Sequence, residues 1–335
     1  MTNATKTLAL LFAGTLALAF ASSWTWTPGA SAAFQQELLA VDSSAVQAVR
    51  VERPDRTSLR LKRTGNGWSV APADTSVSYP ANDRSVRQLL STLPSLQVSA
   101  VVTRQSDKHP RYGVDSTGTT ITMLGEGGEE LGQLIVGRMR IRRSQSGGRR
   151  RTPMRRRRRG GTPITYVRSP GQPDVYSVEQ SLRSITGRSV EDWRDKQIWG
   201  LSRRDVQRVD FRYPADSSFT IKRVVPNDTS ATQDAWVSAG DTLSQSKVSS
   251  MLRTLTAPEA DGFAENMSPQ NFGKAKYTIR LHLADGTTRT LQLRPGSNDQ
   301  QYLATAKGYP YVVEFRSRTW DRAVLRGRSA YLKNE

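Results

Sequence analysis

The same short pattern occurs twice in this 335-residue chain, about 160 residues apart. Four pairs of residues share a spacing of 160: Val49 and Val209, Pro54 and Pro214, Lys62 and Lys222, and Arg63 and Arg223. A pattern that recurs at such a distance indicates two units of one fold, so both must use the same order of elements. The duplication therefore restricts the fold to one that each half of the chain can form separately.

Each copy predicts a hairpin of two strands followed by one helix. Apolar and polar residues alternate around Leu61 and again around Ile221, which is typical of a half-buried strand. The hairpin then reaches Trp68 in the first copy and Trp236 in the second. Residues at helical spacing follow in both copies: Val86, Leu89, Leu90 and Leu93 after Asn82-Asp83, and Val248, Met251, Leu252 and Leu255 after Ser244.

A second pair of strands follows each helix, and here the two copies differ in length. The hairpins are expected around residues 125–128 and around Asp285-Gly286. Ile121 and Ile279 lie 158 residues apart, whereas Tyr166 aligns with Tyr302 at a distance of 136. The first copy therefore carries 22 additional residues (158 minus 136), at about 140–161.

These patterns predict an α+β protein in which an N-terminal membrane segment at 1–33 precedes two duplicated units of antiparallel strands with one main helix each. The first unit is expected to span 34–200, with an Arg-rich insertion at 140–161, and the second 201–335. A charged segment at 189–196 is predicted to be a short helix that ends the first unit with its charges exposed.

The N-terminal segment predicts export. No charged residue lies between Lys6 and Glu37, and a helix of residues 8–26 would be about 28 Å long, roughly one bilayer core. Positive charge only before the segment favours a cytoplasmic N-terminus and an extracytoplasmic, periplasmic body anchored in the inner membrane. The alternative is a signal peptide cleaved after Ala32, which gives a secreted form. The residues expected in the membrane are Leu8, Leu10, Leu11, Phe12, Leu16, Leu18, Phe20, Trp24 and Trp26.

The insertion holds most of the excess positive charge. The chain has 49 Lys+Arg and 30 Asp+Glu, and 12 arginines lie between residues 138 and 159. The first interpretation of the insertion is a solvated, variable loop without a dedicated ligand. If it does bind a partner, its guanidinium groups favour anionic lipid or an envelope polymer, and after these an acidic protein. Nucleic acid is the least favoured, because no aromatic residue interrupts the run. The candidate polyanion-binding residues are Arg149, Arg150, Arg151, Arg155, Arg156, Arg157, Arg158 and Arg159.

Catalytic and cofactor signatures are missing from the sequence. The chain has no cysteine and only two histidines, His109 and His282, so thiolate chemistry is excluded and no metal or cofactor site is expected. His282 is predicted to lie on the polar face of a strand as an ordinary surface residue. An unrecognised hydrolase would need carboxylates from distant segments, such as Glu129 and Glu265, to converge in one pocket. The sequence therefore favours a protein that is not an enzyme.

The order of several short motifs resembles domain-of-unknown-function family 4340. The residues that carry the resemblance are Gly67-Trp68-Ser69-Val70, the helix at 86–93, Arg111-Tyr112-Gly113-Val114-Asp115, Tyr166-Val167-Arg168, Asp174-Val175-Tyr176 and Trp193-Arg194-Asp195-Lys196. Members of this family look like extracytoplasmic proteins with one N-terminal membrane segment, often encoded beside gliding-motility-type ABC transporters. The resemblance implies an accessory role in a transport or envelope assembly, with ABC transporter subunits as partners, and supplies no catalytic residues. A secreted polyanion-binding module and a carboxylate hydrolase are the alternatives.

Overall fold

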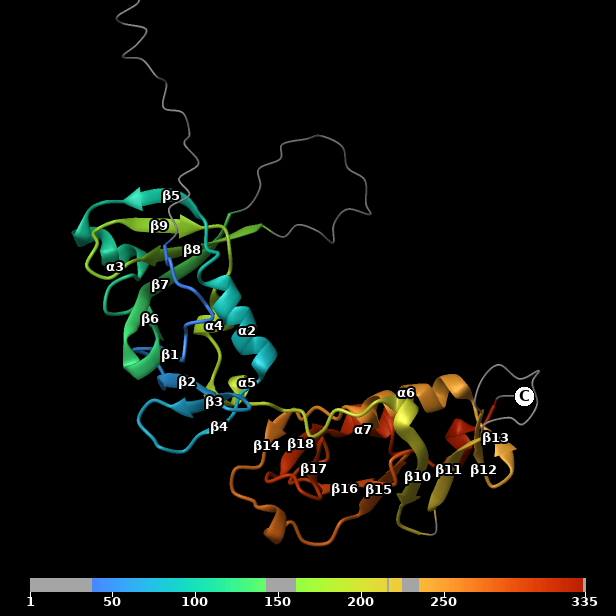
Figure 1. Cartoon of the computed structure of the whole chain (residues 1–335). Coiled ribbons are helices and arrows are strands. Elements are labelled where there is room, and N and C mark those ends of the chain that lie inside the picture. Colours follow the sequence, from blue (N-terminus) through green and yellow to red (C-terminus); the bar gives the residue numbers. More distant parts are fainter. Residues whose placement is uncertain (1–37, 143–160, 216, 225–234, 334–335) are drawn as a thin grey trace, which may run out of the picture. The chain divides into compact units, whose positions relative to one another are not determined.

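The structure is a computed structural model that describes residues 38–142, 161–215, 217–224 and 235–333 (Figure 1). The chain divides into two compact units, Met1–Val190 and Glu191–Glu335. The predicted membrane segment at 1–33 and the candidate arginines at 149–151 and 155–159 lie outside the described residues. Within the described part, every helix is too short or too polar to cross a bilayer.

The first unit is built on one antiparallel sheet of nine strands in the order β4-β3-β2-β1-β6-β7-β8-β9-β5. The strands are β1 (Ala48–Glu52), β2 (Leu59–Thr64), β3 (Gly67–Pro72), β4 (Tyr79–Pro80), β5 (Val98–Thr103), β6 (Thr119–Leu124), β7 (Glu130–Arg142), β8 (Thr162–Arg168) and β9 (Val175–Val178).

The second unit is built on a second antiparallel sheet of nine strands in the order β13-β12-β11-β10-β15-β16-β17-β18-β14. The strands are β10 (Val206–Arg212), β11 (Phe219–Val224), β12 (Ala235–Ser238), β13 (Asp241–Thr242), β14 (Gly262–Phe263), β15 (Tyr277–Leu283), β16 (Thr288–Pro295), β17 (Gln301–Ala306) and β18 (Val313–Arg316).

The two sheets have the same topology. When β1 is matched with β10 and the following strands are matched in sequence order, the strand orders are identical. The pairing agrees at single residues as well, because Arg63 lies opposite Trp68 and Arg223 lies opposite Trp236. The predicted duplication and the α+β class are therefore confirmed.

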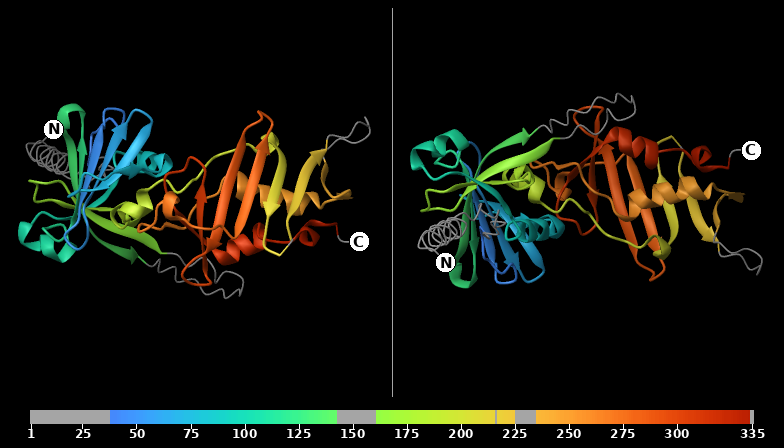
Figure 2. Two further views of the ribbon diagram at one scale, coloured as in Figure 1. Left: turned by 90° about the horizontal axis from the view of Figure 1, so that it is seen from below. Right: turned by 90° about the horizontal axis from the view of Figure 1, so that it is seen from above.

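One long helix crosses each sheet. Helix α2 (Asp83–Thr92) follows the edge strand β4 and leads to the opposite edge strand β5, and α6 (Gln245–Thr256) joins β13 to β14 in the same way (Figure 2). The predicted start of the first helix is confirmed, since the Asn82 side chain accepts a hydrogen bond of 3.0 Å from the Ser85 N–H. The predicted start of the second helix is confirmed too, because α6 begins directly after Ser244.

The core of the second unit lies between α6 and one face of its sheet. Val248, Met251, Leu252 and Leu255 are buried there against strand residues such as Leu281. Burying a side chain of this size stabilises the fold by roughly 1.5–3 kcal/mol. The residues that alternate with the buried ones along β15 are only partly buried, and Arg280 and His282 among them are polar. The other face of the same sheet is therefore polar.

A segment before β1, which we call the first entry segment (38–46), completes the core of the first unit. Leu38 and Leu39 are buried although they belong to no strand or helix. The segment lies close to β7, since a methyl group on Gly132 would come within 2.8 Å of the Val41 side chain and 2.9 Å of the Leu39 side chain. The first residues that the structure describes are therefore fixed to the sheet.

The second unit has an equivalent segment, the second entry segment (198–206), at the same spacing of 160 residues. Ile198, Trp199 and Leu201 pack against the core of the second unit. The Trp199 indole N–H donates a hydrogen bond of 2.8 Å to the carbonyl oxygen of Leu255 in α6. The duplicated part thus includes these irregular segments, and the structure places residues 191–200 with the second unit.

The insertion in the first copy begins as an extension of the sheet. Strand β7 has 13 residues whereas its counterpart β16 has 8, and its last residues still pair with β8. Beyond a register shift in this pair, Val167 occupies the position that Ala304 has in the second sheet. The predicted alignment of Tyr166 with Tyr302 is therefore wrong by one residue, which moves each side chain to the opposite face.

Short helices complete the two units. The α-helical turns are α3 (His109–Tyr112), α4 (Arg183–Thr186), α5 (Val190–Trp193) and α7 (Ser317–Ala323). The 3-10 helices are η1 (Ser106–Lys108), η2 (Glu126–Gly128), η4 (Arg203–Asp205), η5 (Pro269–Asn271) and η6 (Arg328–Tyr331).

Candidate functional site

The extension of the sheet at the insertion forms an arm with two different faces. We define the arm as residues 138–142 of β7 with residues 162–165 of β8. Because side chains alternate along a strand, Arg140 and Arg142 share one face and Met139 and Ile141 share the other. Arg138 lies within the register shift between Val136 and Met139. The two apolar side chains are exposed, with 36% of Met139 and 59% of Ile141 accessible. The arm therefore presents a basic face and an exposed apolar face.

Local contacts hold the basic face of the arm in place. The Arg140 guanidinium lies 5.8 Å from the centre of the Tyr166 ring, and Arg142 forms an ion pair of 2.5 Å with Glu179. Both partners lie on neighbouring parts of the same unit. These contacts hold Arg140 and Arg142 at the point where the chain enters the Arg-rich stretch. Such an arm combines apolar contact with cationic contact, as residues at a membrane interface do.

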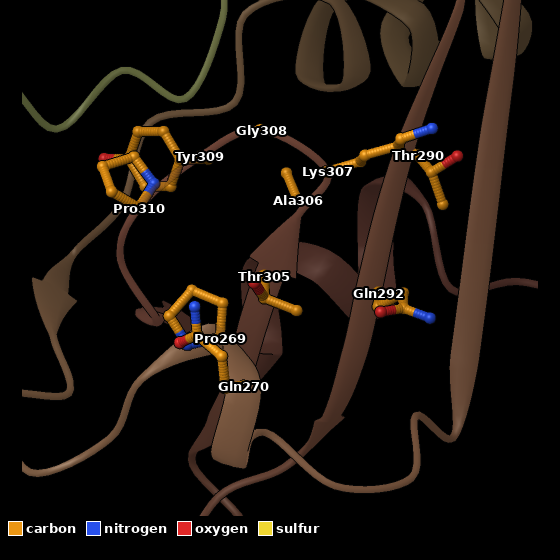
Figure 3. Close-up of a pocket in the computed structure, with 10 residues that line it drawn as sticks. All are labelled: Pro269, Gln270, Thr290, Gln292, Thr305, Ala306, Lys307, Gly308, Tyr309 and Pro310. Atoms are coloured by element: carbon orange, nitrogen blue, oxygen red, sulfur yellow. The ribbon is translucent and has the colours of Figure 1, made fainter.

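The second unit has a cavity of about 640 Å³ on the polar face of its sheet (Figure 3). Strands β16 and β17, the turn after β17 and helix η5 supply its walls. The lining residues are Pro269, Gln270, Thr290, Gln292, Thr305, Ala306, Lys307, Gly308, Tyr309 and Pro310. None of these residues was singled out from the sequence. Carboxamides, hydroxyls and one ammonium group supply donors and acceptors, so the cavity is suited to a polar ligand.

His282 belongs to a hydrogen-bonded network on the same polar face, beside Asp210 of β10. The His282 Nε2 atom lies 2.8 Å from Asp210, which also accepts hydrogen bonds of 2.6 Å from Arg208 and 2.8 Å from Thr220. Burial alone raises the pKa of the Asp210 carboxyl, but these hydrogen bonds outweigh it and hold the pKa below its ordinary value. On the other side of the ring, the Thr288 hydroxyl lies 3.4 Å from Nδ1.

This network resembles the hydroxyl–histidine–carboxylate arrangement of some enzymes. Its side chains, however, form their hydrogen bonds with one another. Asp210 holds two further donors besides the imidazole, and Thr288 is an exposed residue at the start of β16. The network ties β10, β11 and β15 together across the polar face. We therefore interpret His282 as a structural surface residue, as the sequence indicated.

Among the described residues of the second unit, Arg194 is the most buried charged side chain. Only 3% of its side chain is exposed, and its guanidinium lies 3.5 Å from the centre of the Phe263 ring and 5.0 Å from that of Tyr311. It also forms an ion pair with Glu265. The prediction that the charges of this segment are exposed is wrong for Arg194, because stacking on two rings makes burial of a guanidinium favourable.

A pair of carboxylates lies near this centre, at the edge strand β14. Glu191 and Glu314 both approach Gly262, where a methyl group would come within 3.1 Å of one carboxylate and 3.3 Å of the other. Burial raises the pKa of Glu314, and the negative charge of Glu191 raises it further. Within the described residues, no group of three or more His, Cys, Asp or Glu side chains is arranged to hold a metal ion.

The two carboxylates named for the hydrolase alternative have separate surroundings. Glu129 lies in the exposed turn before β7 of the first unit, where its backbone closes the hairpin with Gly125. Glu265 belongs to the second unit and is engaged by Arg194. The candidate polyanion-binding arginines and the candidate membrane residues lie outside the described residues, so their placement stays a prediction.

Comparison with known proteins gives one match. A family model described as Domain of unknown function (DUF4340) matches residues 73–146 and 158–307, which amounts to 74 and 150 residues of the 335. The match is interrupted at 147–157, inside the Arg-rich insertion, so the family pattern does not extend across that stretch. No curated protein and no solved structure matches the chain.

Proposed function

This chain belongs to the DUF4340 family, and we propose that it is a membrane-tethered, extracytoplasmic, non-enzymatic component of an ABC-type transport or envelope assembly. The observation that carries the proposal is the arm, which exposes an apolar face and a basic face on the unit that directly follows the N-terminal segment. The transport partner follows from the accessory role that the family resemblance implies.

The N-terminal sequence supports a tether. Residues 8–26 are uncharged and long enough to span a bilayer as a helix. The first entry segment begins at Leu38, so only residues 27–37 separate Trp26 from the sheet. Fully extended, this stretch spans about 40 Å at most. A chain anchored at residues 8–26 would therefore keep the first unit close to the membrane surface.

The arm supports contact with anionic lipid. Its three described arginines lie next to nine more in the sequence up to residue 159. Each basic residue near an anionic surface contributes about 1 kcal/mol of binding free energy. Exposed Ile141 and Met139 would add apolar contact at the level of the headgroups.

The tether is tested by fractionation of cells that make the full chain. An alkaline wash of membranes removes peripheral proteins but leaves a protein with a membrane-spanning helix in the pellet. We expect the chain to stay in the pellet, to carry residues 1–33, and to be digested by protease added from the extracytoplasmic side. Recovery of a soluble chain that begins at Ala33 would instead support the secreted polyanion-binding module. A chain that remains intact and soluble in the cytosol contradicts both.

The contact of the arm is tested with a photo-crosslinking amino acid placed at Ile141 in the full chain. Val77 is the matched control, because it is also an exposed aliphatic residue of the first unit, with 55% of its surface accessible. We expect lipid adducts at position 141 and not at position 77. Protein adducts at position 141 without lipid adducts would show that the arm binds a protein partner instead.

The assembly partner is tested by crosslinked pull-down from membranes. The full chain is compared with a variant in which Asn-Gly replaces residues 143–160. Arg142 and Thr162 pair directly, so this short turn together with Gly161 can close the hairpin of the arm. A control variant replaces the exposed Arg60, Arg84 and Arg87 by glutamine, which removes charge elsewhere in the first unit. We expect transporter subunits with the full chain and the control. Retention of the same partners by the deletion variant would remove the Arg-rich stretch from the mechanism.

A further inference from the structure

We propose that the cavity on the polar face of the second sheet binds an acidic saccharide, that is, a glycan unit that carries a carboxylate. This ligand goes beyond the tether and assembly role proposed above and does not depend on it. The volume of about 640 Å³ lies within the range of about 300–1,000 Å³ that small-molecule sites occupy. All lining residues belong to the second unit, so the site is complete within that unit.

The walls of the cavity match a ligand with many hydroxyl groups. Gln270 and Gln292 each offer a carboxamide that both donates and accepts hydrogen bonds, and Thr290 and Thr305 add two hydroxyls. Groups of this kind pair with neighbouring hydroxyls of a sugar, which also donate and accept. Among the described residues, no carboxylate lines the cavity, so its walls carry no negative side chain.

One end of the cavity is apolar. Tyr309 and Pro310 lie together at one side, and Pro269 lies beside Gln270 and Thr305, as Figure 3 shows. The Tyr309 ring is held edge-on against Tyr311 with the ring centres 5.6 Å apart. Burial raises the pKa of Tyr309 to about 12, so its hydroxyl stays neutral. Rigid rings of this type suit the C–H face of a sugar ring.

The opposite end of the cavity carries positive charge. Lys307 lies beside Thr290 at the side away from Tyr309 (Figure 3). Within the described residues, Lys307 pairs with no carboxylate. This end therefore favours an anionic group on the ligand.

The first unit shows that the fold alone does not produce the cavity. Strand registers place Ile135 where the second unit has Gln292, and Arg168 where it has Thr305. Ile135 is buried there in a small apolar cluster, and the Arg168 side chain donates a hydrogen bond of 2.9 Å to the Val114 carbonyl oxygen. The larger Arg168 side chain fills this position in the first unit, whereas the smaller Thr305 leaves it open in the second.

The proposal is tested by calorimetric titration of the full chain in detergent micelles. The probes are the trimer of galacturonic acid, the neutral trisaccharide maltotriose and inorganic phosphate. We expect the acidic trimer to bind and maltotriose to bind at least about 5-fold more weakly. If phosphate displaces the trimer at equal concentration, or if maltotriose binds as tightly, the cavity does not select an acidic saccharide. If no probe binds in the millimolar range, the proposal fails.

Three variants locate the binding in the cavity. Thr305→Arg introduces the residue of the first unit, and we expect it to weaken binding of the trimer by at least about 10-fold. If that variant does not fold, as judged by its circular dichroism, Gln292→Ile is used instead. It introduces the apolar residue of the first unit at similar size and removes one carboxamide from the wall, so weaker binding of the trimer is again expected. Lys307→Gln is expected to weaken binding of the acidic trimer by about 5–10-fold and to leave the affinity for maltotriose unchanged.

Lys222→Gln is the matched control, because it removes the same charge from an exposed position on β11, outside the lining of the cavity. We expect this variant to bind the trimer as the unaltered chain does. Normal binding by the folded Thr305→Arg or Gln292→Ile variant, or equal losses in Lys222→Gln and Lys307→Gln, would overturn the proposed site.

Discussion

Replacement of Arg194 by alanine should destabilise the second unit by about 3 kcal/mol. The buried guanidinium lies 3.5 Å from the centre of the Phe263 ring, and a desolvated contact of this kind contributes about 2 kcal/mol. A hydrogen bond to a charged group adds about 1.5–3 kcal/mol, but the partner Glu265 is 58% exposed and is hydrated once Arg194 is removed. The two contributions overlap, so the total lies below their sum.

Two further substitutions separate charge from packing. Arg194→Lys keeps the positive charge but loses the planar group that stacks on the rings, and it should cost about 1–2 kcal/mol. Arg194→Met keeps an apolar stem of similar length, and it should cost less than the alanine variant because it fills the same space. If methionine and alanine cost the same, the space that the side chain fills contributes little.

Hydrogen exchange of the full chain measures these effects in the second unit alone. The slowest amides of β10 and β15 report the free energy of opening of this unit, and a loss of 3 kcal/mol accelerates them by roughly 100-fold. Arg212→Ala is the control, since Arg212 is exposed on β10 and its loss should change the free energy by less than about 0.5 kcal/mol. An effect of Arg194→Ala no larger than that of the control would refute the reasoning.

Three other substitutions have clear expectations. Asp210→Asn should cost about 1–2 kcal/mol at pH 7 and little near pH 2, since a carboxyl with a lowered pKa stabilises the fold above its ordinary pKa and loses this effect as pH falls; melting curves across this range measure it. Glu314→Gln should raise the melting temperature at pH 7 and not at pH 4, because a carboxyl with a raised pKa destabilises the fold once pH exceeds its ordinary value, and an equal shift at both pH values would contradict this. Gly137→Ala should cost about 1–3 kcal/mol in urea unfolding, because the new methyl group would meet the Tyr112 carbonyl oxygen at 2.3 Å, while an unchanged midpoint would show that the backbone yields freely.

The regular elements of the fold could be predicted from the sequence because their patterns are local. Alternation around Leu61 and Ile221 predicted the first hairpins, and Asn82 marked the start of α2. The duplication supported each of these predictions, because the same pattern occurs at the corresponding place in the other copy. The alignment of Tyr166 failed because a register shift between two strands leaves no mark in the sequence.

The candidate site was harder to predict because its residues are ordinary by type. On the two strands, polar residues alternate with apolar ones as in any half-exposed strand; they are Thr290, Gln292 and Thr305. A cavity forms only because the loop that carries Pro269 supplies another wall. Arg194 lies in a charged segment that is typical of an exposed helix, and its burial depends on rings distant in sequence. One signal was available, because the duplication allows each residue to be compared with its counterpart. Thr305 stands where the first unit has the larger Arg168, and Gln292 stands where it has the apolar Ile135.

The second entry segment determines where this protein can be divided. A fragment that starts at residue 201 would lack Trp199, whose indole N–H donates a hydrogen bond to the carbonyl oxygen of Leu255. It would also lack Arg194, whose guanidinium stacks on Phe263. Cutting between Val190 and Glu191 keeps both with their own sheet. Duplicated proteins of this type are therefore separated correctly only when the irregular stretch ahead of the first strand is counted as part of the repeat.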